Sequence, residues 1–276
     1  MEICNNLKFA DAANLINFYQ KHENNDFRFE KNEKNLSISS FNVHGWMNIN
    51  KKIKKIDNFM KIIKMFDELN LDILILQEVS PLVTKNLNFI YSEFSKIGFK
   101  YHFSVPNGQY KKIYDSFISI FSKKEIQERN KLDLTIINLV RYIPIVKIND
   151  IQIAGIHLEI GYRFHHLLDS DLRKQIILGN EQIRKKQLEK LLENYKNLDI
   201  IIGDFNFQPT DKEFNIIQQN FNYFQELSNS NPYNRSDMCF LAKHNKILCT
   251  KFMTLSCNYS DHLPIINEFL TFDKKN

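Results

Sequence analysis

Apolar and polar residues follow one another along the chain in blocks that predict both strands and helices. Short runs rich in Ile, Leu and Val have the length of buried strands, and longer segments repeat apolar residues three and four positions apart, as on one face of a helix. Strands are predicted at 72–76, 101–105, 116–121, 134–140, 151–156, 200–202, 237–241, 251–255 and 263–269, after a first strand-like run at 36–45. Helices are predicted at 52–70, 82–97 and 171–195. Helices that alternate with strands in each half indicate an α/β or α+β fold with large sheets.

Two of the predicted helices have an apolar face that would cover a sheet. The helix at 52–70 carries five apolar residues on one side: Ile53, Ile56, Met60, Ile63 and Phe66. The helix at 171–195 turns another five inward: Ile176, Ile183, Leu188, Leu191 and Leu192.

The domain organisation is predicted to be simple. No linker rich in Pro, Gly or Ser divides the chain, so residues 36–270 are predicted to form one domain. Residues 1–35 precede it as an extension that we predict to be helical and packed on the body, and residues 271–276 form a C-terminal tail.

The most informative polar residues stand after the apolar run at 200–202. Gly203 follows this run, and then Asp204 and Asn206 stand two positions apart. Side chains two apart point the same way in a strand, so both are expected to project from the carboxyl end of this strand. The pair combines an anionic base or metal ligand with a neutral hydrogen-bonding group.

Four other strand-like runs begin or end in polar residues of the same kinds. They supply Asn42, Glu78, His157, Asp261 and His262. A carboxylate that directly follows a buried run is costly unless it is solvated or coordinated, which favours Glu78 as a metal ligand. Carboxylates, amides and imidazoles at strand ends are what a hard divalent cation such as Mg²⁺ and a phosphodiester require.

Taken in order, these segments resemble a known family. They are Phe41-Asn42-Val43-His44-Gly45, Gln77-Glu78-Val79, His157-Leu158-Glu159, Gly203-Asp204-Phe205-Asn206 and Ser260-Asp261-His262, with a weaker match at 235–241. They are similar to the motifs of the endonuclease/exonuclease/phosphatase superfamily (DNase I-like), and the segment that begins at His157 is nearest to the tyrosyl-DNA phosphodiesterase 2 branch. The resemblance covers residues 36 to 270. It implies an α+β fold, a four-layer α/β/β/α sandwich of two packed mixed sheets with outer helices and the site across one edge.

The resemblance implies a cation site. Glu78 would be the main Mg²⁺ ligand, Asp261 and Asn42 would be further ligands, and Mn²⁺ would substitute for Mg²⁺. Asn42 would also bind phosphate. His44 lies at a position that varies in the family, and the resemblance gives it no role beyond a structural or substrate-facing one.

The resemblance also implies the catalytic residues. Asp204 would orient or deprotonate the attacking water, and Asn206 would hold the phosphate or that water. His157 and His262 would stabilise the charge that develops on the phosphate. Asp237 would support His262, although the residues on either side of Asp237 depart from the family's usual Ile and Tyr.

A further segment resembles the same branch. Arg184 and Gln187 are similar to the Arg-x-x-Gln that begins a helix there, but the preceding stretch at 160–181 is longer in this chain. We interpret that stretch as a candidate substrate-facing loop.

Charge favours a polyanionic partner. The formal net charge is +5, which suits nucleic acid, and we predict DNA. Basic clusters occur at 51–55, 111–112, 123–124 and 184–186. Each one taken alone is typical of a solvated face, but Lys123-Lys124 and Arg184-Lys185 are candidates for the wall of a nucleic-acid groove.

The remaining composition bears on compartment. Four cysteines form no CxxC pair, and the first residues lack a basic region followed by an apolar run. We therefore predict reduced thiols, no signal peptide and an intracellular protein, cytoplasmic or nuclear. No run reaches the length of a membrane span, and we expect a monomer.

The predicted activity is Mg²⁺-dependent cleavage of phosphoester bonds by direct attack of water, since no Ser or Cys nucleophile stands beside a base. The positive charge and the segment at His157 favour a nuclease or a DNA-end-processing phosphodiesterase. Two alternatives stay open. One is a lipid- or inositol-directed phosphatase or sphingomyelinase-like enzyme, and the other is a catalytically inactive binding module of the same fold.

Overall fold

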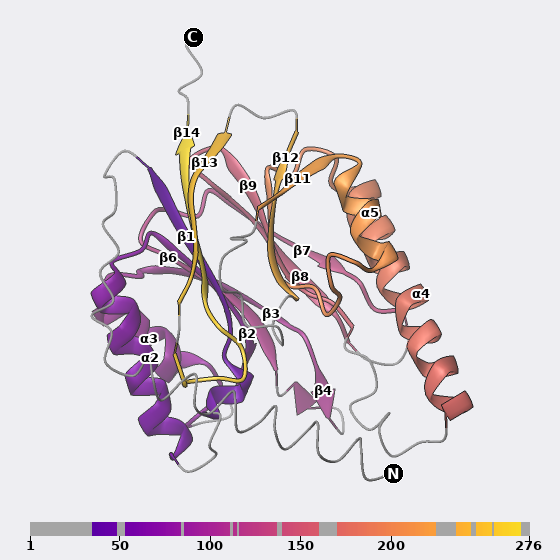
Figure 1. Ribbon diagram of the computed structural model, residues 1–276. Helices are drawn as coiled ribbons and strands as arrows, with labels where there is room; N and C mark the ends of the chain where they lie inside the picture. The colour runs from indigo at the N-terminus through magenta and orange to yellow at the C-terminus, as the bar shows by residue number, and fades with distance from the viewer. Residues whose placement is uncertain are drawn as a thin grey trace.

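Two sheets packed face to face, with helices on both outer faces, make up the computed structural model of the chain (Figure 1). The structure describes residues 35–48, 53–83, 86–110, 113–114, 116–136, 140–159, 170–224, 236–243, 247–255 and 257–271. The predicted helix within 1–34 and the tail beyond 271 lie outside these residues, as does the part of the predicted loop at 160–169.

The first sheet has six strands in the order β13-β14-β1-β2-β6-β3. Their bounds are β1 Leu36–Asn42, β2 Ile73–Val79, β3 Tyr101–Pro106, β6 Phe117–Ser122, β13 Ile247–Thr254 and β14 Ile265–Thr271. Strands β1 and β2 run parallel, and every other pair in this sheet is antiparallel. The sheet is therefore mixed, and its parallel pair sends two strand ends to the same edge.

The second sheet also has six strands, in the order β11-β12-β10-β9-β8-β7. Their bounds are β7 Glu128–Asp133, β8 Tyr142–Ile148, β9 Ile151–His157, β10 Ile200–Asp204, β11 Phe221–Phe224 and β12 Asp237–Ala242. Here β9 and β10 form the parallel pair. A separate two-stranded ribbon joins β4 Gln109–Tyr110 to β5 Ile113–Tyr114.

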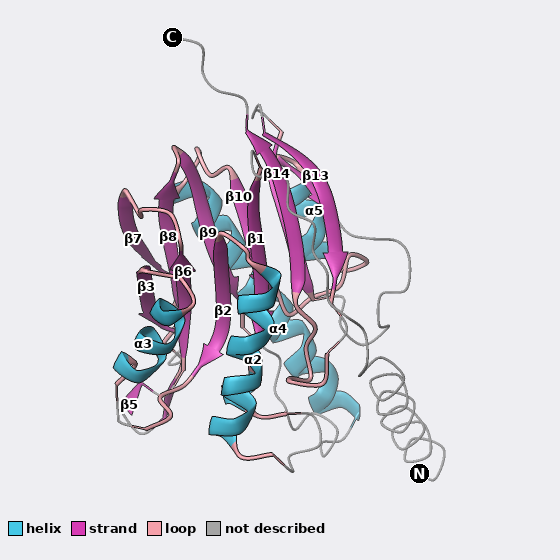
Figure 2. Ribbon diagram, turned by 90° about the vertical axis from the view of Figure 1, so that its left-hand side faces the viewer, coloured by secondary structure: helices cyan, strands magenta, loops and turns pink. Residues whose placement is uncertain are grey.

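Helices cover the outer face of each sheet. Helices α2 Lys55–Leu69 and α3 Asn88–Lys96 lie on the first sheet, as Figure 2 shows, and α4 Ser170–Asn194 and α5 Lys212–Gln218 lie on the second (Figure 1). The short turn η1 His44–Trp46 follows β1. The four layers confirm the predicted α/β/β/α sandwich. No helix in the described part of the chain is long and apolar enough to cross a membrane.

Apolar side chains fill the space between the two sheets and the space between the first sheet and its helices. Ile75 of the first sheet and Ile153 and Ile202 of the second belong to one buried cluster between the sheets. Aromatic rings fill the space under α2 and α3, where Phe94 stacks on Phe121 with centroids 4.1 Å apart. Strands buried on both faces need near-continuous apolar sequence, which is why the strands at 72–76 and 200–202 could be predicted from solid apolar runs.

Two predictions about elements are wrong. Met60 is 43% exposed, whereas Ile63 and Phe66 are buried as predicted, together with Phe59 and Ile62. The strand predicted at 134–140 is also misplaced. The strand in this region is β7, Glu128–Asp133, an edge strand with five exposed residues of six, so it has no apolar alternation to read. Strands β8 and β11 and helix α5 were not predicted from the sequence.

Gly155 sets how closely the two sheets approach. It lies in β9, and a Cβ placed on it would come 2.9 Å from Cγ2 of Ile75 and 3.3 Å from Cγ of Pro144. Ile75 belongs to the opposite sheet and its branched side chain has few rotamers. A larger residue at 155 must therefore push the sheets apart.

We expect Gly155→Ala to lower the free energy of unfolding by about 1–3 kcal/mol, the usual cost of overpacking a core. Urea denaturation followed by circular dichroism measures it. Gly179→Ala is the matched control, because a Cβ there meets nothing within 4 Å and the residue lies inside α4. That variant should be neutral or stabilising by about 0.5–1 kcal/mol. Equal stability of the two variants would contradict the tight packing at Gly155.

Candidate active site

Four strands bring polar residues to one edge of the sandwich. Asn42 ends β1, Glu78 lies next to the end of β2, His157 ends β9 and Asp204 ends β10. The side-chain amide of Asn42 donates to Oε1 of Glu78 at 3.3 Å and to Oδ2 of Asp204 at 3.1 Å. Since Glu78 belongs to the first sheet and Asp204 to the second, one amide links carboxylates on both sheets.

The backbone departs from strand geometry at this edge. The pairing of β2 with β6 shifts register between Leu76 and Val79, and Glu78 within the shift has φ 54°. A bulge of this kind changes the direction of one side chain. Here that side chain is Glu78, the predicted metal ligand. The half-buried Glu78 side chain reaches the Asn42 amide from this bulge.

The strand argument for Asn206 is wrong in its geometry. Strand β10 ends at Asp204, and Asn206 stands beyond it with φ 53°. The two residues are nevertheless close, because the backbone N–H of Asn206 donates to Oδ1 of Asp204 at 2.9 Å. The amide nitrogen of Asn206 donates to the carbonyl oxygen of Leu158 at 3.0 Å, so a turn and not a strand places this side chain.

His262 pairs with two acids at the same edge. Its Nδ1 lies 2.8 Å from Oδ2 of Asp237 and its Nε2 lies 3.7 Å from Oδ2 of Asp204. Burial alone would lower the pKa of His262, but the carboxylates of Asp237 and Asp204 outweigh it and raise that pKa to about 10. The imidazole is therefore cationic at neutral pH.

The two acids around His262 differ. Burial raises the pKa of Asp237 to about 6, against the lowering effect of His262. For Asp204, burial acts in the same raising sense, but His262, His157 and the N–H groups of Asn206 and Asn42 together lower its pKa. Asp204 is therefore ionised at neutral pH, although its side chain is buried.

The imidazole ring of His157 is buried among the described residues at the end of β9. It is 4% exposed, and neither ring nitrogen has a hydrogen-bond partner among the described residues. Its Nε2 lies 3.9 Å from Oε1 of Glu78 and 3.9 Å from Oδ2 of Asp204. Burial and then the charge of Arg141 lower the pKa of His157 to about 4, so the ring is neutral. Buried polar atoms normally have hydrogen-bond partners. Both ring nitrogens of His157 could therefore form a hydrogen bond with a bound ligand.

A buried ion pair behind His157 was not predicted from the sequence. Nε of Arg141 donates to Oε2 of Glu159 at 3.1 Å, and its Nη1 donates to Oδ1 of Asn107 at 2.7 Å. The Asn107 amide in turn donates to the carbonyl oxygen of His157 at 3.4 Å. Gln187 accepts from the backbone N–H of Glu159 at 3.0 Å, so it contacts the segment that carries His157. Arg141 had no motif signal, whereas Glu159 and Gln187 stood in segments that the resemblance had singled out.

Asp261 and His44 lie on the outer side of the cluster. Asp261 is exposed, and its Oδ1 lies 3.4 Å from Nδ1 of His44. The same His44 nitrogen lies 3.7 Å from Oε2 of Glu78. Ser260, next to Asp261, donates through its hydroxyl to the carbonyl oxygen of Asn42 at 2.7 Å, which ties the 260–262 segment to β1.

The donor set fits a divalent cation. Carboxylates of Glu78, Asp204 and Asp261 and the amide of Asn42 gather within this edge, and oxygen donors of this type suit Mg²⁺ and Mn²⁺. Asp204, Asp237 and His262 also present ligand atoms within 4.8 Å of one another. The 2.8 Å hydrogen bond between His262 and Asp237 already occupies one atom of each, which favours the Glu78 side of the cluster for the ion.

Two predicted groove-lining clusters are not where they were expected. The backbone N–H of Lys123 donates to the carbonyl oxygen of Asp72, at the start of β2 and the end opposite Glu78. Arg184 is buried, and its Nε and Nη2 lie 2.9 and 2.8 Å from Oε1 of Glu213. Lys123 therefore lies away from the site, and Arg184 is paired with Glu213, so neither residue lines the site as predicted. The place of the exposed Lys185 in a groove stays a prediction.

Two other lysines lie near the site, at the start of α2. Lys54 and Lys55 are exposed at the start of α2, and Nζ of Lys55 lies 3.7 Å from where a Cβ on Gly45 would stand.

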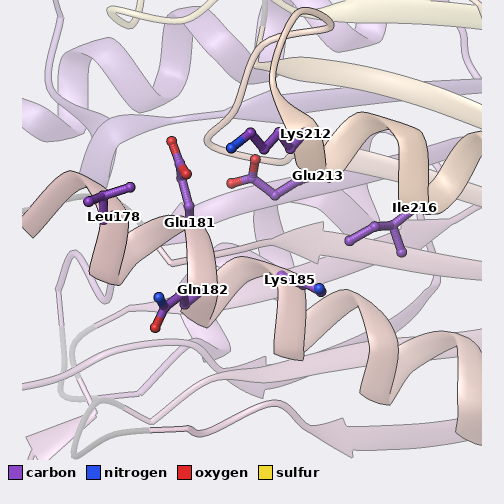
Figure 3. A pocket seen from close by; sticks show the side chains of 7 residues that line it. All are labelled: Leu178, Glu181, Gln182, Lys185, Lys212, Glu213 and Ile216. Atoms are coloured by element: carbon purple, nitrogen blue, oxygen red, sulfur yellow. The ribbon is translucent and has the colours of Figure 1, made fainter.

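Figure 3 shows a pocket between α4 and α5, separate from the strand-end cluster. Its lining mixes both charges: Leu178, Glu181, Gln182, Lys185, Lys212, Glu213 and Ile216. That mixture does not suit a polyanion.

Solved structures share this architecture. Neither a protein-family model nor a curated protein matches the chain by sequence. The human Nocturnin catalytic domain with bound sulfate has TM-score 0.65 and 17% identity, over 87% of this chain and 95% of that one. TDP2 of D. rerio, complexed with single-strand DNA product, has TM-score 0.59 and 18% identity, over 86% and 99%. An endonuclease/exonuclease/phosphatase family protein from Leptotrichia buccalis has TM-score 0.61 and 16% identity, over 84% and 98%.

The chain has the endonuclease/exonuclease/phosphatase fold. The resemblance seen in the strand-end motifs is thus confirmed for the fold. Identities this low establish the architecture and not the substrate, so the roles of the site residues rest on their own geometry.

The Asn42 amide should be essential to keep two carboxylates together. We expect Asn42→Asp to lower the free energy of unfolding by more than about 2 kcal/mol in EDTA, because it removes two hydrogen bonds to charged groups and adds a third negative charge. A divalent cation should restore part of this loss. Urea denaturation at pH 8 with EDTA or with MgCl₂ measures both effects.

The control for this experiment is Asn130→Asp. Asn130 is exposed on β7, so the change should stay within about 0.5 kcal/mol in either buffer. If Asn42→Asp is as stable as wild type in EDTA, the amide does not hold the two acids.

Proposed function

We propose that the chain is a metal-dependent phosphoric ester hydrolase that cleaves phosphodiesters by direct attack of water. The observation that carries the proposal is His157, a buried neutral imidazole with both nitrogens unpartnered within the described residues, 3.9 Å from each of two carboxylates. A phosphoryl oxygen in this position would accept the hydrogen bond that the ring lacks.

The proposed cation site would balance the negative charge of the phosphodiester. Glu78 would hold a divalent cation together with Asp261 and Asn42, with Mg²⁺ as the ion and Mn²⁺ as its substitute. When bound, such an ion polarises a phosphoryl oxygen and neutralises charge that develops on it. The exposed Asp261 and the half-buried Glu78 leave this side of the cluster accessible.

Asp204 is the candidate general base. It is ionised because His262, His157 and two N–H donors lower its pKa, and its Oδ2 faces both imidazoles. We propose that it orients and deprotonates the attacking water. Asn206 takes part through the turn that fixes Asp204, and it is proposed to hold the phosphate or that water.

His262 supplies a fixed positive charge. Asp237 holds the ring through Nδ1 at 2.8 Å, which leaves Nε2 as the donor toward Asp204 and toward a phosphoryl oxygen. This supports the proposed role of Asp237 as the residue that positions His262. Ser260, the hydroxyl nearest to the cluster in sequence, is committed to the Asn42 carbonyl, which supports direct attack of water instead of a covalent serine intermediate.

The proposed substrate is nucleic acid, with DNA ends or single strands first. The net charge of +5 and the two lysines at the start of α2, beside the turn at 44–46, support a polyanionic substrate. TDP2 of D. rerio, a structural neighbour, was solved with a single-strand DNA product. A tyrosyl-DNA phosphodiesterase-like activity is the finer form of this proposal.

The activity test compares substrates and one isosteric variant. Asp204→Asn keeps the shape of the side chain but removes its charge, so kcat should fall by a factor of about 10² or more while binding persists. Wild type and variant are offered plasmid DNA, a 5′-tyrosyl oligonucleotide, RNA and sphingomyelin, with Mg²⁺ or EDTA. Asp133→Asn is the control, since Asp133 is exposed at the end of β7.

The outcomes separate the alternatives. Weaker binding of Asp204→Asn with unchanged kcat would assign Asp204 to recognition and not to catalysis. Cleavage of sphingomyelin alone would establish the lipid-directed alternative. Binding without cleavage of any substrate would establish an inactive binding module.

A second test uses two charge reversals at opposite ends of the first sheet. In the Asp204→Asn background, Lys54→Glu with Lys55→Glu should flatten the slope of log affinity against log salt by about 0.7 for each single-strand phosphate that the variant no longer neutralises. Lys123→Glu with Lys124→Glu should leave the slope unchanged, because those lysines lie at the far end of β2. Fluorescence anisotropy of a labelled single-strand oligonucleotide measures both. Equal slopes in the two double variants, or binding that salt does not weaken, would contradict a nucleic-acid groove beside α2.

A further inference from the structure

The hydrogen-bond ladder between β8 and β9 ends before it reaches His157. The antiparallel pairs of these two strands end with Ile145 opposite Ala154. The next residue of β8 toward the site is Pro144, which has no N–H to donate. If the register continued, Tyr142 would stand opposite His157. On the β8 side, the end of the strand that carries His157 is therefore held by something other than the ladder.

The side-chain amide of Asn107 joins the two strands beyond that point. Asn107 directly follows β3 and is buried. Its Nδ2 donates to the carbonyl oxygen of Tyr142 at 3.1 Å and to the carbonyl oxygen of His157 at 3.4 Å. On the other side of β9, His157 stands opposite Asp204 of β10, and the N–H of Leu158 donates to the Asp204 carbonyl oxygen at 3.1 Å. The position of His157 relative to β8 therefore depends on Asn107.

Arg141 holds Asn107 and the segment that follows His157. Its Nη1 donates to Oδ1 and to the backbone carbonyl oxygen of Asn107 at 2.7 and 3.3 Å. Its Nε and Nη2 donate to Oε2 and Oε1 of Glu159 at 3.1 and 3.4 Å. Arg141 and Glu159 are both buried. All three nitrogens of one guanidinium are therefore used to fix the two neighbours of the His157 backbone.

The backbone of Arg141 is itself anchored. The N–H of Leu134 donates to the carbonyl oxygen of Arg141 at 2.6 Å, and the N–H of Arg141 donates to Oγ1 of Thr135 at 3.1 Å. Gln187 of α4 donates to the carbonyl oxygen of Leu134 at 3.1 Å and accepts from the N–H of Glu159 at 3.0 Å. The guanidinium is thus fixed relative to β8, to the end of β9 and to α4.

The imidazole of His157 depends on this backbone for its position. Neither ring nitrogen has a hydrogen-bond partner among the described residues, whereas the ring of His262 is held by Asp237 at 2.8 Å. The strand end and the packing around it therefore place the His157 ring. A displacement of about 1 Å in a catalytic group can lower a rate on the order of a hundredfold.

We propose that Arg141 is a positioning residue, which directs the His157 imidazole at the bound phosphate by fixing Asn107 and Glu159 around the end of β9. This inference rests on the proposed function, in which His157 donates a hydrogen bond to a phosphoryl oxygen. It assigns a buried ion pair outside the catalytic cluster to the reaction. The role requires the forked shape of the guanidinium, because a lysine ammonium is a point charge that lacks the fork.

The test changes the fork and keeps the charge. Arg141→Lys leaves a cation beside Glu159 but cannot also hold Asn107. For a substrate that wild type cleaves with Mg²⁺, kcat should fall by about tenfold to a hundredfold, with a smaller change in KM. Asn107→Asp is the second variant, because its carboxylate can still accept from Arg141 but cannot donate to the carbonyl oxygen of His157. It should show the same loss.

A second readout does not depend on turnover. In protein labelled with ¹³C and ¹⁵N in histidine, the nuclear magnetic resonance signals of the His157 ring are assigned by their loss in His157→Gln. These signals should shift in Arg141→Lys and in Asn107→Asp, because the ring moves. The charge at position 141 is the same in wild type and in Arg141→Lys, so a shift in that variant reports geometry. Circular dichroism shows that each variant is folded.

Arg184→Lys is the matched control. Arg184 forms a buried pair with Glu213 between α4 and α5, and its Nε and Nη2 both contact one carboxylate oxygen. This variant should leave kcat and the His157 ring signals unchanged.

Three results would overturn the proposal. The ring signals of His157 could stay unchanged in both Arg141→Lys and Asn107→Asp, they could shift while kcat stays at the wild-type value, or Arg184→Lys could lose as much kcat as Arg141→Lys. A wild-type protein that cleaves no phosphoester would refute the proposed function, and the ring signals alone would then decide whether Arg141 positions His157.

Discussion

The Asn42 amide joins the two sheets at the edge where the candidate active site lies. It donates to Glu78 of its own sheet and to Asp204 of the other, so the spacing of the sheets fixes the separation of the two carboxylates. That spacing depends on apolar packing deeper in the sandwich, where Gly155 leaves room for the methyl group of Ile75. The geometry of this polar cluster therefore depends on a core that is close-packed and resists compression.

Buried charge is distributed unevenly in this fold. Arg184 pairs with Glu213 between α4 and α5, and Arg141 pairs with Glu159 behind His157, as expected for buried ions. Among the described residues at the edge, the acids outnumber the cations, and the buried imidazole of His157, without a hydrogen bond there, is neutral because burial and Arg141 depress its pKa. A bound cation would offset this excess negative charge, which is the electrostatic reason that the edge suits a divalent ion.

The apolar pattern predicted strands well where they are buried on both faces, since β2 and β10 begin with unbroken runs of Ile and Leu. The sandwich itself was predicted from the family resemblance. The apolar pattern failed at the periphery. Strand β7 is an edge strand whose residues are mostly exposed and charged, so hydrogen bonds to β8, and not side-chain burial, define it. The face of α2 was predicted with Met60 inward, because apolar spacing alone could not distinguish Met60 from its neighbour Phe59.

At the site, the sequence predicted which residues take part but not how their side chains are oriented. The residues at the strand ends were identified from their chemistry and order, but their orientation depends on backbone that leaves regular structure. Glu78 turns in a bulge, Asn206 turns after β10 ends, and His44 turns within a left-handed segment anchored by Trp46. Period-two reasoning assumes an unbroken strand, so it could place Asp204 but not Asn206. Each departure occurs at or near the end of a strand. Only there can the hydrogen-bond ladder between strands be interrupted without unpairing the core. One edge of an otherwise regular sandwich can therefore hold many polar side chains that point toward one another.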